Sequence, residues 1–391
     1  MPATHLPPFA NFQTEIYLKG TTGERPPFTT DLAGLEEVAR RVLTDQAFGY
    51  VAGSAGSGST ARANRAAFDR WRIVPRMLRD VSERDLSTTV LGSAMAAPVL
   101  LAPVGVQTIV HPDGELASAR AAAGTGLVFV HSTAAAHSIE QVAEASGDGR
   151  RWYQLYWPND RDVATSLIGR AEAAGYSALV VTLDTFVMGW RPTDLDTAYL
   201  PFLQGIGIAN YVTDPAFTAP LADDAPPTAA VMRWAGMFGN PALTWADLAW
   251  LREQTSLPFV LKGVLHPDDA RAAVDAGVDG LVVSNHGGRQ VDGAIAALDA
   301  LPGVVEAVGD ALPVLFDSGV RTGADVIKAV ALGAVAVLYG RPYIYGLGLG
   351  GQVGVEHVLR CLLGEMEVTM ALSGRRAVAD LASDVLAASP P

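Results

Sequence analysis

A repeated unit of helix, glycine and strand constrains the fold of this chain more than any other feature. Four segments share it: ARAAAGTGLVFV, RAEAAGYSALVV, RAAVDAGVDGLVV and KAVALGAVAVLYG. In each segment a helix of small residues ends at a glycine (Gly124, Gly175, Gly277 or Gly333), and an apolar run begins within a few residues. Glycine suits the left-handed position that ends a helix. A helix that leads directly into an apolar strand is half of a β-α-β unit, so the repeat predicts parallel strands.

Eight apolar runs have the length and composition of buried strands. Most of them begin 21–33 residues after the preceding run, which is the length of one βα unit. Eight such units close into a barrel, so the expected fold is α/β, a single (β/α)8 TIM barrel. The expected strands are 99–104, 127–132, 152–156, 178–184, 259–263, 280–285, 313–318 and 334–341.

The spacing is interrupted once, where 81 residues separate the starts of the fourth and fifth expected strands. Residues 195–245 in this gap are rich in proline, glycine, aromatic residues and aspartate. A long insertion at the carboxyl end of a barrel strand lies over the active site, so we expect a lid. The predicted organisation is an N-terminal arm and helix at 1–48, then the barrel at 49–391. In the N-terminal part we expect an extended arm at 1–30 and a helix at 31–48, and in the barrel part an outer helix at 352–373.

Composition excludes several classes of partner. Apolar residues make up 49% of the chain and charged residues 18%, so a large core is available. The formal net charge of −13 argues against nucleic acid or an anionic membrane surface. A single cysteine, Cys361, rules out an internal disulfide and a cysteine-rich metal site. The sequence shows neither a signal peptide nor 18 uninterrupted apolar residues, so we expect a soluble cytoplasmic protein without membrane association.

A doubly wound dinucleotide-binding fold is the alternative architecture. Its glycine fingerprint should follow the first strand, but VGVQTIVHPDGE stands there. The motif GLGLGG at 346–351 follows the last expected strand and has no later acidic partner. We therefore expect 346–351 to be a loop and favour the barrel.

The segment LVVSNHGGRQ at 281–290 carries the clearest chemical signal. The apolar strand stops at Ser284, and then come His286, a pair of glycines and Arg289. A lone histidine is usually part of a core, but here a base and a cation stand together where a strand ends. Catalytic groups of barrel enzymes are presented at the carboxyl ends of the strands. The segment therefore favours an active site.

Residues with reactive or ligand-binding groups stand at the carboxyl ends of all eight expected strands. Each could have a structural role alone, but their occurrence at every strand end favours a single site. In chain order they are Pro103, Val104 and Gly105; Ser132; Gln154 and Tyr156; Thr182, Asp184 and Arg191; Lys262; Ser284, His286 and Arg289; Asp317, Ser318, Gly319 and Arg321; Gly340 and Arg341.

Two anion subsites are expected within this set. The glycines and arginines after the last two strands, including Arg321 and Arg341, suit a phosphate. Arg191 and Arg289 suit a carboxylate and are expected far around the ring from the phosphate. Between them His286 can act as a base whose orientation Asp184 fixes. 

Two other catalytic readings receive little support from the motifs. A Ser-His-Asp hydrolase built on Ser284, His286 and Asp184 lacks a nucleophile elbow. No metal-binding spacing of histidine, cysteine or carboxylate residues is apparent, so no metal is expected.

The motifs SNHGGRQ, FDSGVRTGADVIKAVALGA and GRP resemble those of the FMN-dependent α-hydroxy-acid oxidases and dehydrogenases. The resemblance runs from about Tyr50 to Met370. The motifs YVAGS, APVGV, TLDTFVMGWRPTDL and NYVTDP are most similar to the lactate 2-monooxygenase branch of the family.

This resemblance implies an FMN cofactor, a small 2-hydroxy acid and O2 as substrates, and a homo-oligomer, either a tetramer or an octamer. His286 would accept a substrate proton and Asp184 would pair with it. Tyr50, Arg191 and Arg289 would bind the substrate carboxylate, and Tyr156 the hydroxyl. The implied FMN contacts are Pro103, Val104, Gly105, Ser132, Gln154, Thr182, Lys262, Ser284, Asp317, Ser318, Gly319, Arg321, Gly340 and Arg341.

The implied reaction converts L-lactate and O2 into acetate, CO2 and water. Oxidases of the family release the 2-oxo acid and hydrogen peroxide instead, and they tend to carry alanine where this chain has Gly105. Glycolate oxidases carry tryptophan near the substrate where this chain has Ala134, so the substrate's size is open. A quinone-linked membrane dehydrogenase is a third alternative, but the insertion at 195–245 lacks the composition of a membrane-binding segment. A non-catalytic flavin- or phosphate-binding barrel is the alternative from another class.

Overall fold

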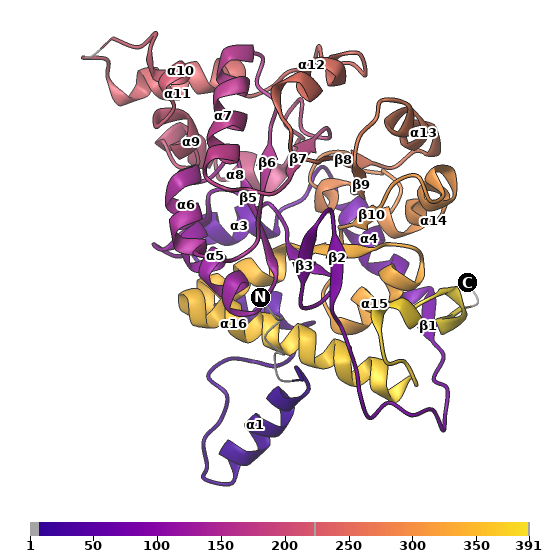
Figure 1. Ribbon diagram of the computed structural model, residues 1–391. Coiled ribbons are helices and arrows are strands. Elements are labelled where there is room, and N and C mark those ends of the chain that lie inside the picture. Colours follow the sequence, from indigo (N-terminus) through magenta and orange to yellow (C-terminus); the bar gives the residue numbers. More distant parts are fainter. Residues whose placement is uncertain (1–7, 223, 390–391) are drawn as a thin grey trace.

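Eight short parallel strands close into a barrel in the computed structural model, which describes residues 8–222 and 224–389 (Figure 1). Neighbouring strands around the ring run in the order β10-β11-β4-β5-β6-β7-β8-β9, and β9 pairs with β10 to close it. The predicted (β/α)8 barrel is therefore confirmed. Its strands are β4 (Val99–Leu101), β5 (Val128–Ser132), β6 (Arg151–Leu155), β7 (Leu179–Thr182), β8 (Phe259–Val264), β9 (Gly280–Val283), β10 (Val314–Phe316) and β11 (Ala336–Tyr339).

Most strands end earlier than the apolar runs predicted. The run at 280–285 forms a strand only to Val283, and the run at 334–341 only from Ala336 to Tyr339. The polar residues that follow leave the hydrogen-bonded ladder and turn over the barrel rim. His286, for example, begins a short 3-10 turn, η3 (His286–Gly288).

Alternating side chains of the strands supply two separate apolar layers. Leu100, Val130, Trp152 and Leu315 belong to one buried cluster, whereas the adjacent Leu101 belongs to a second cluster shared with the helices. Period-two alternation places the first cluster inside the barrel and the second outside. A hairpin of β2 (Thr88–Val90) and β3 (Ser93–Met95) closes one end, since its Val90 and Met95 join the inner cluster. Trp152 Nε1 donates to Ser93 Oγ at 2.9 Å.

The helices of the repeat surround the strands. They are α5 (Gly114–Gly124), α6 (Ile139–Ser146), α7 (Arg161–Ala173), α13 (Pro267–Asp275), α14 (Ala297–Val308) and α15 (Gly323–Ala331). Gly175, Gly277 and Gly333 have positive φ after their helices, as the repeat predicted. In the first unit the prediction was wrong by two residues, because Gly124 remains in the helix and Gly126, at φ 70°, makes the turn.

The N-terminal part differs from the prediction. The arm expected to be extended contains α1 (Asn11–Gly20), and the single helix expected at 31–48 is two helices, α2 (Leu35–Arg40) and α3 (Asp45–Ala52). The break occurs because the Thr44 side chain accepts the Ala47 N–H and so starts a new helix. Residues 1–7 of the expected arm lie outside the described residues. Beyond α3 come α4 (Ser59–Asp69) and β1 (Trp71–Ile73), which pairs with β12 (Leu386–Ala388) near the C-terminus.

The C-terminal helix is longer than expected. The segment 346–351, predicted to be a loop, lies within α16 (Arg341–Leu372), whose backbone leaves helical geometry only at Gly350 and Gly351. A Cβ on Gly350 would lie 2.3 Å from the ring of Phe28, so this glycine permits close packing of the N-terminal segment.

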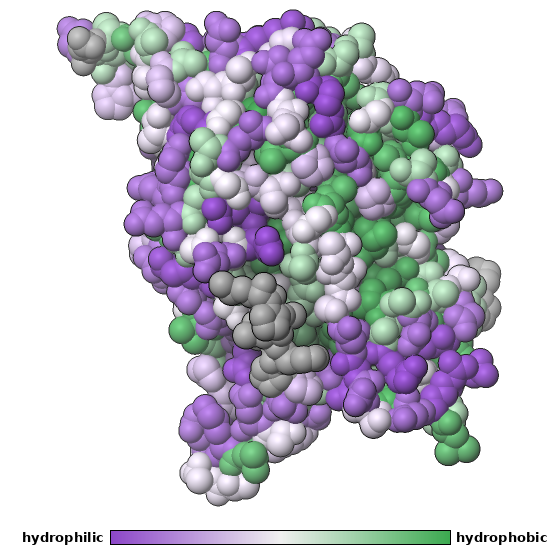
Figure 2. Space-filling model, in the orientation of Figure 1, coloured by the Kyte–Doolittle hydropathy of each residue, from purple (hydrophilic) through white to green (hydrophobic). Residues whose placement is uncertain are grey.

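The insertion after β7 is helical. It contains α8 (Pro192–Asp196), η2 (Pro201–Gln204), α9 (Ala209–Val212), α10 (Pro215–Thr218), α11 (Pro227–Met237) and α12 (Asp247–Gln254). Asn210 ties it to the barrel by donating to the carbonyls of Ser132 and Thr133 at 3.1 and 3.0 Å. Hydrophilic residues dominate much of the face shown in Figure 2, with apolar residues visible between them. Among the described helices, none is long and apolar enough to cross a membrane.

Candidate active site

A cavity that is partly open to solvent lies at the carboxyl ends of the barrel strands. It gathers the residues that sequence analysis found after separate strands. The predicted residues that line it are Tyr50, Pro103, Val104, Gly105, Tyr156, Thr182, Arg191, Lys262, His286, Arg289, Asp317, Ser318, Gly319, Arg321, Gly340 and Arg341. Asp184, Ser132, Gln154 and Ser284 do not line it, but each bonds directly to a residue that does or to another of these four.

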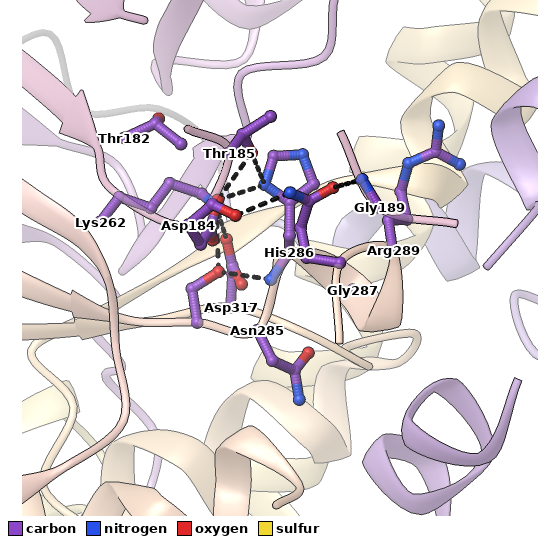
Figure 3. Close-up of polar contacts among 12 residues, drawn as sticks. Thr182, Asp184, Thr185, Gly189, Lys262, Asn285, His286, Gly287, Arg289 and Asp317 are labelled. Carbon is purple, nitrogen blue, oxygen red and sulfur yellow. Dashed lines mark hydrogen bonds and ion pairs between the residues drawn. The ribbon is translucent and has the colours of Figure 1, made fainter. Parts of the chain in front are cut away.

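His286 and Asp184 form a close pair at the centre of the site (Figure 3). His286 Nδ1 lies 2.7 Å from Asp184 Oδ1, and Thr185 Oγ1 donates to the same carboxylate oxygen at 2.9 Å. Burial alone would raise the pKa of Asp184, but the charges of His286 and Lys262 hold it well below its usual value. The ionised carboxylate accepts the Nδ1 proton, so the other ring nitrogen, Nε2, is free to act as a base.

The pKa of His286 is lowered from its ordinary value. Burial is the largest cause, and the positive charge of Lys262 adds to it, while Asp184 opposes the shift. His286 also has a positive φ of 58°, in the left-handed region that is uncommon for a residue with a side chain. The backbone N–H of His286 donates to Ser284 Oγ at 3.0 Å, which helps to hold this backbone conformation. The neutral imidazole is therefore the dominant form near neutral pH.

Lys262 is a buried cation between two carboxylates. Its Nζ lies 3.3 Å from Asp317 Oδ2 and 3.7 Å from Asp184 Oδ2, and it donates to Ser284 Oγ at 2.9 Å. Burial alone would lower the pKa of Lys262, but the two aspartates hold it above its usual value. The site therefore keeps a fixed positive charge beside the cavity.

Arg191 and Arg289 converge on the side of the cavity next to His286. Arg191 Nε donates to the Arg289 carbonyl at 3.1 Å, and its NH2 group donates to Gln290 Oε1 at 2.7 Å. Burial and the charge of Arg289 lower the pKa of Arg191 to about 10. Among the described residues, the carboxylate paired with Arg191 is that of Asp194, at 3.9 Å. Arg191 and Arg289 line the same cavity, and the charge of Arg289 disfavours the charged form of Arg191, so the pair suits a carboxylate ligand.

Arg341 is buried among backbone carbonyls. Its guanidinium donates to the carbonyls of Val51, Gly53 and Gly287 at 2.8–3.0 Å, and no salt-bridging carboxylate is recorded within 4.0 Å among the described residues. Burial lowers the pKa of Arg341 to about 10. A buried cation without an ionic partner is costly, so the donor set fits an anion such as a phosphate.

The two predicted anion subsites are closer together than expected. Arg289 donates to the Gly53 carbonyl at 2.9 Å, and Arg341 donates to the same oxygen at 2.8 Å. The expectation that Arg289 lies far around the ring from the phosphate residues was therefore wrong. The segment from Tyr50 to Gly53 folds back over the rim and joins the two arginines, which strand spacing alone does not reveal.

A chain of hydrogen bonds runs under the other side of the cavity. Ser132 Oγ donates to Gln154 Oε1, and Gln154 Nε2 donates to Thr182 Oγ1, both at 2.9 Å. On the opposite side Ser318 has φ 84°, and its Oγ accepts the N–H groups of Asn285 and Gly287. These bonds fix three strand ends and the turn before Arg289.

Several residues of the site were missed from the sequence. Gln290 bonds Arg191 and also donates to the carbonyl of Asp184 at 2.7 Å, although it stands in the motif that drew attention to His286. Met188, Phe202 and Phe238 form an apolar wall of the cavity. The rings of Phe202 and Phe238 pack on Trp234 of α11, with centroids 4.6 and 4.8 Å away. Only the aromatic content of the insertion hinted at this wall.

Burial also affects two tyrosines of the site. It raises the pKa of Tyr50, against the lowering effect of Arg289 and Arg191, and it raises the pKa of Tyr156 to about 12. Both phenols therefore remain protonated and can donate hydrogen bonds to a ligand. Over residues 8–222 and 224–389, no three or more His, Cys, Asp or Glu side chains are grouped so as to hold a metal ion.

Comparisons with known proteins show the family to which the chain belongs. Residues 39–388 match the family model described as FMN-dependent dehydrogenase. An FMN-dependent alpha-hydroxy acid dehydrogenase of Penicillium citrinum is 47% identical, with 97% of each chain covered. An L-lactate oxidase of Lysinibacillus sphaericus is 43% identical and covers 94% of this chain and 95% of its own. A crystal structure of mandelate oxidase superposes with a TM-score of 0.82 at 39% identity, over 93% of this chain and 99% of the other. The chain therefore belongs to the family of FMN-dependent α-hydroxy acid dehydrogenases and oxidases.

Proposed function

We propose that this enzyme oxidises L-lactate and keeps the product bound until oxygen has reacted, giving acetate, CO2 and water as a lactate 2-monooxygenase does. Oxidation of a 2-hydroxy acid with FMN follows from the family. The observation that supports a 2-hydroxy acid as the substrate is the position of the His286–Asp184 pair beside Arg191 and Arg289. This arrangement sets a base next to two arginines that can bind a carboxylate. The name of the Lysinibacillus relative, L-lactate oxidase, supports lactate as the substrate.

The residues act on the substrate in complementary ways. Arg191 and Arg289 bind its carboxylate, and this fixes the position of Cα near His286. Nε2 of His286 takes the α-proton, or the hydroxyl proton if a hydride leaves Cα. Asp184 stabilises the resulting imidazolium through Nδ1. Tyr156 donates to the substrate hydroxyl. Phe202 and Phe238 of the insertion, together with Met188 before it, form a lid that excludes water.

The cofactor fits the remaining donors of the cavity. Arg341 and Arg321, with the backbone around Ser318, Gly319 and Gly340, would hold its phosphate, and Asp317 would hold its ribityl chain. The rest of the cofactor would contact Pro103, Val104, Gly105, Ser132, Gln154, Thr182 and Ser284. Bound FMN supplies the acceptor for the two electrons that leave the substrate. Lys262 would provide a fixed positive charge beside the flavin ring.

The second candidate is an oxidase that releases pyruvate and hydrogen peroxide, and the name of the Lysinibacillus relative, L-lactate oxidase, favours it. The deciding experiment is product analysis after aerobic turnover of L-lactate. Acetate and CO2 without peroxide would support the monooxygenase, whereas one peroxide and one pyruvate per lactate would establish the oxidase. A folded, FMN-loaded protein whose flavin no 2-hydroxy acid bleaches would support a non-catalytic barrel.

Gly105→Ala is expected to shift the products from acetate towards pyruvate and peroxide. A Cβ at this position would lie 2.4 Å from the Ala134 carbonyl oxygen, so the two loops must move apart. Glycine is therefore needed at this position for backbone contact between the two loops. Peroxide per lactate, measured for both proteins, checks the shift. An unchanged peroxide yield in a folded variant would contradict it.

The reduction of the flavin by lactate should have its acidic limb below pH 6.5. His286 works in its neutral form, and its pKa lies below the ordinary histidine value of about 6.5 because of burial and Lys262. Activity is therefore expected to be constant around neutral pH and to fall only as His286 becomes protonated. Anaerobic stopped-flow reduction between pH 5 and 8 gives the profile. A half-maximal rate above pH 7 would contradict the neutral base.

We also propose a homo-oligomer, as the resemblance implies. The helix α1 extends away from the barrel in Figure 1, and it contains no buried residue. Its Tyr17 and Leu18 are 68% and 64% exposed, which a neighbouring subunit would reduce. Light scattering after size-exclusion chromatography gives the subunit number. The cytoplasmic location expected from the sequence stays a prediction.

A further inference from the structure

A strained residue lies next to the cavity on the loop after β4. Val106 has φ 50° and ψ 33° and is fully buried. This left-handed conformation is a genuine outlier for a β-branched side chain, so surrounding contacts must hold it. Its chain neighbour Gly105 lines the cavity.

The loop after β4 rests directly on the loop after β5. The N–H of Val106 donates to the Ala134 carbonyl at 2.9 Å, and Gly105 packs against the same carbonyl. Ala134 also lines the cavity. The two loops therefore form one wall, and its position depends on what keeps them together.

Glu115 of α5 bonds to both loops from behind this wall. The carboxylate is fully buried. Its Oε1 accepts the N–H of Gln107, next to Val106, and the N–H of Ala136, each at 3.1 Å. Its Oε2 lies 2.8 Å from Nδ1 of His137. One carboxylate thus uses both oxygens on the two loops.

The side chain of Gln107 links this buried cluster to Val104, a residue of the cavity. Its amide donates to the Val104 carbonyl at 2.9 Å, and its oxygen accepts from Ser118 Oγ at 2.7 Å. Val104 lines the cavity, whereas Glu115 does not. Nothing in the proposed chemistry uses Glu115, yet it holds Gln107 and Ala136, which lie two residues beyond Gly105 and Ala134 of the wall.

We propose that Glu115 is a positioning residue, which clamps the loops after β4 and β5 and so sets the wall formed by Val104, Gly105 and Ala134. The proposal rests on the proposed function, because this wall borders the space in which product and oxygen would meet. Loosening the clamp lets Val106 relax and moves Gly105 relative to the bound substrate. Retention of the product should then weaken.

The test compares three substitutions in the FMN-loaded enzyme. Glu115→Ala removes the clamp, and Glu115→Asp shortens it so that one carboxylate no longer reaches all three partners. Glu115→Gln keeps an acceptor oxygen and is expected to stay close to wild type. The matched control is Glu367→Asp, since Glu367 is also buried and accepts from the Ala10 N–H and from Arg84, away from the cavity wall.

The alanine and aspartate variants should bind oxalate more weakly by roughly tenfold or more. A displacement of the cavity wall by about 1 Å is enough for such a change, since a misplacement of this size can cost about 100-fold. Peroxide per lactate should rise in both, while flavin content stays near one per chain. Amide hydrogen exchange at Gln107 and Ala136 should accelerate, which reports the clamp without turnover. Glu367→Asp should change none of these quantities.

Unchanged oxalate affinity and peroxide yield in a folded Glu115→Asp variant would overturn the proposal. The same would follow if Glu367→Asp produced equal changes, since the effect would then be general destabilisation. If the wild type already forms one peroxide per lactate, the monooxygenase assignment fails. The clamp is then still tested by oxalate affinity and hydrogen exchange.

Discussion

His286→Ala is expected to bind FMN normally and to lose roughly 10²–10⁴-fold in the rate of flavin reduction by lactate, the usual contribution of a general base. FMN binding should survive because the buried cations Lys262 and Arg341 remain in place. The measurement is anaerobic stopped-flow reduction, with the cofactor content of the purified protein as a check on folding.

The positive φ of His286 requires a second variant. Alanine is strained in the left-handed region, whereas asparagine tolerates it and cannot act as a base near neutral pH. His286→Asn should therefore be as inactive as His286→Ala but more stable. His266→Ala, at the exposed N-cap position that precedes the outer helix α13, serves as the control and should reduce at the normal rate. Near-normal reduction in either His286 variant would refute the assignment of the base.

Arg289→Met and Arg341→Met are expected to separate substrate binding from cofactor binding. Loss of a hydrogen bond between charged groups costs about 1.5–3 kcal/mol, which is roughly a factor of 10 to 150 in affinity. Arg289→Met should weaken oxalate binding by this amount, and Arg341→Met should weaken FMN binding. Titration of the FMN-loaded enzyme with oxalate, and of the cofactor-free protein with FMN, gives both constants.

The shared contact with Gly53 limits how cleanly these two variants separate. Each arginine also donates to that carbonyl, so each loss loosens the segment after Tyr50. Arg191→Met is the cleaner variant for the substrate, because Arg191 bonds to the Arg289 carbonyl and Gln290 but not to that segment. It should weaken oxalate binding and leave FMN affinity near normal. If Arg341→Met affected oxalate alone and Arg191→Met affected FMN alone, the two assignments would be reversed.

The sequence alone was sufficient for the barrel and for most of the polar residues at the ends of its strands. Apolar runs and helix-ending glycines are local features. Eight such runs, four of them preceded by a helix and a glycine, leave a closed parallel barrel as the fitting architecture. Because parallel strands end on the same side of a barrel, the polar residues after each strand could be expected to meet. Positions such as Lys262 and His286 therefore followed from strand ends before any contact was known.

The tertiary structure decided what the local pattern does not contain. Arg289 and Arg341 meet at Gly53, and Glu115 reaches two loops, through contacts between residues distant along the chain or at different strand ends. The strained conformation of Val106 likewise depends on the loop beyond β5. Hydrophobic periodicity reports which face of an element is buried, and glycine reports where the backbone turns. Neither reports which polar group a buried arginine or carboxylate will contact, because that depends on how loops from separate units pack over the rim.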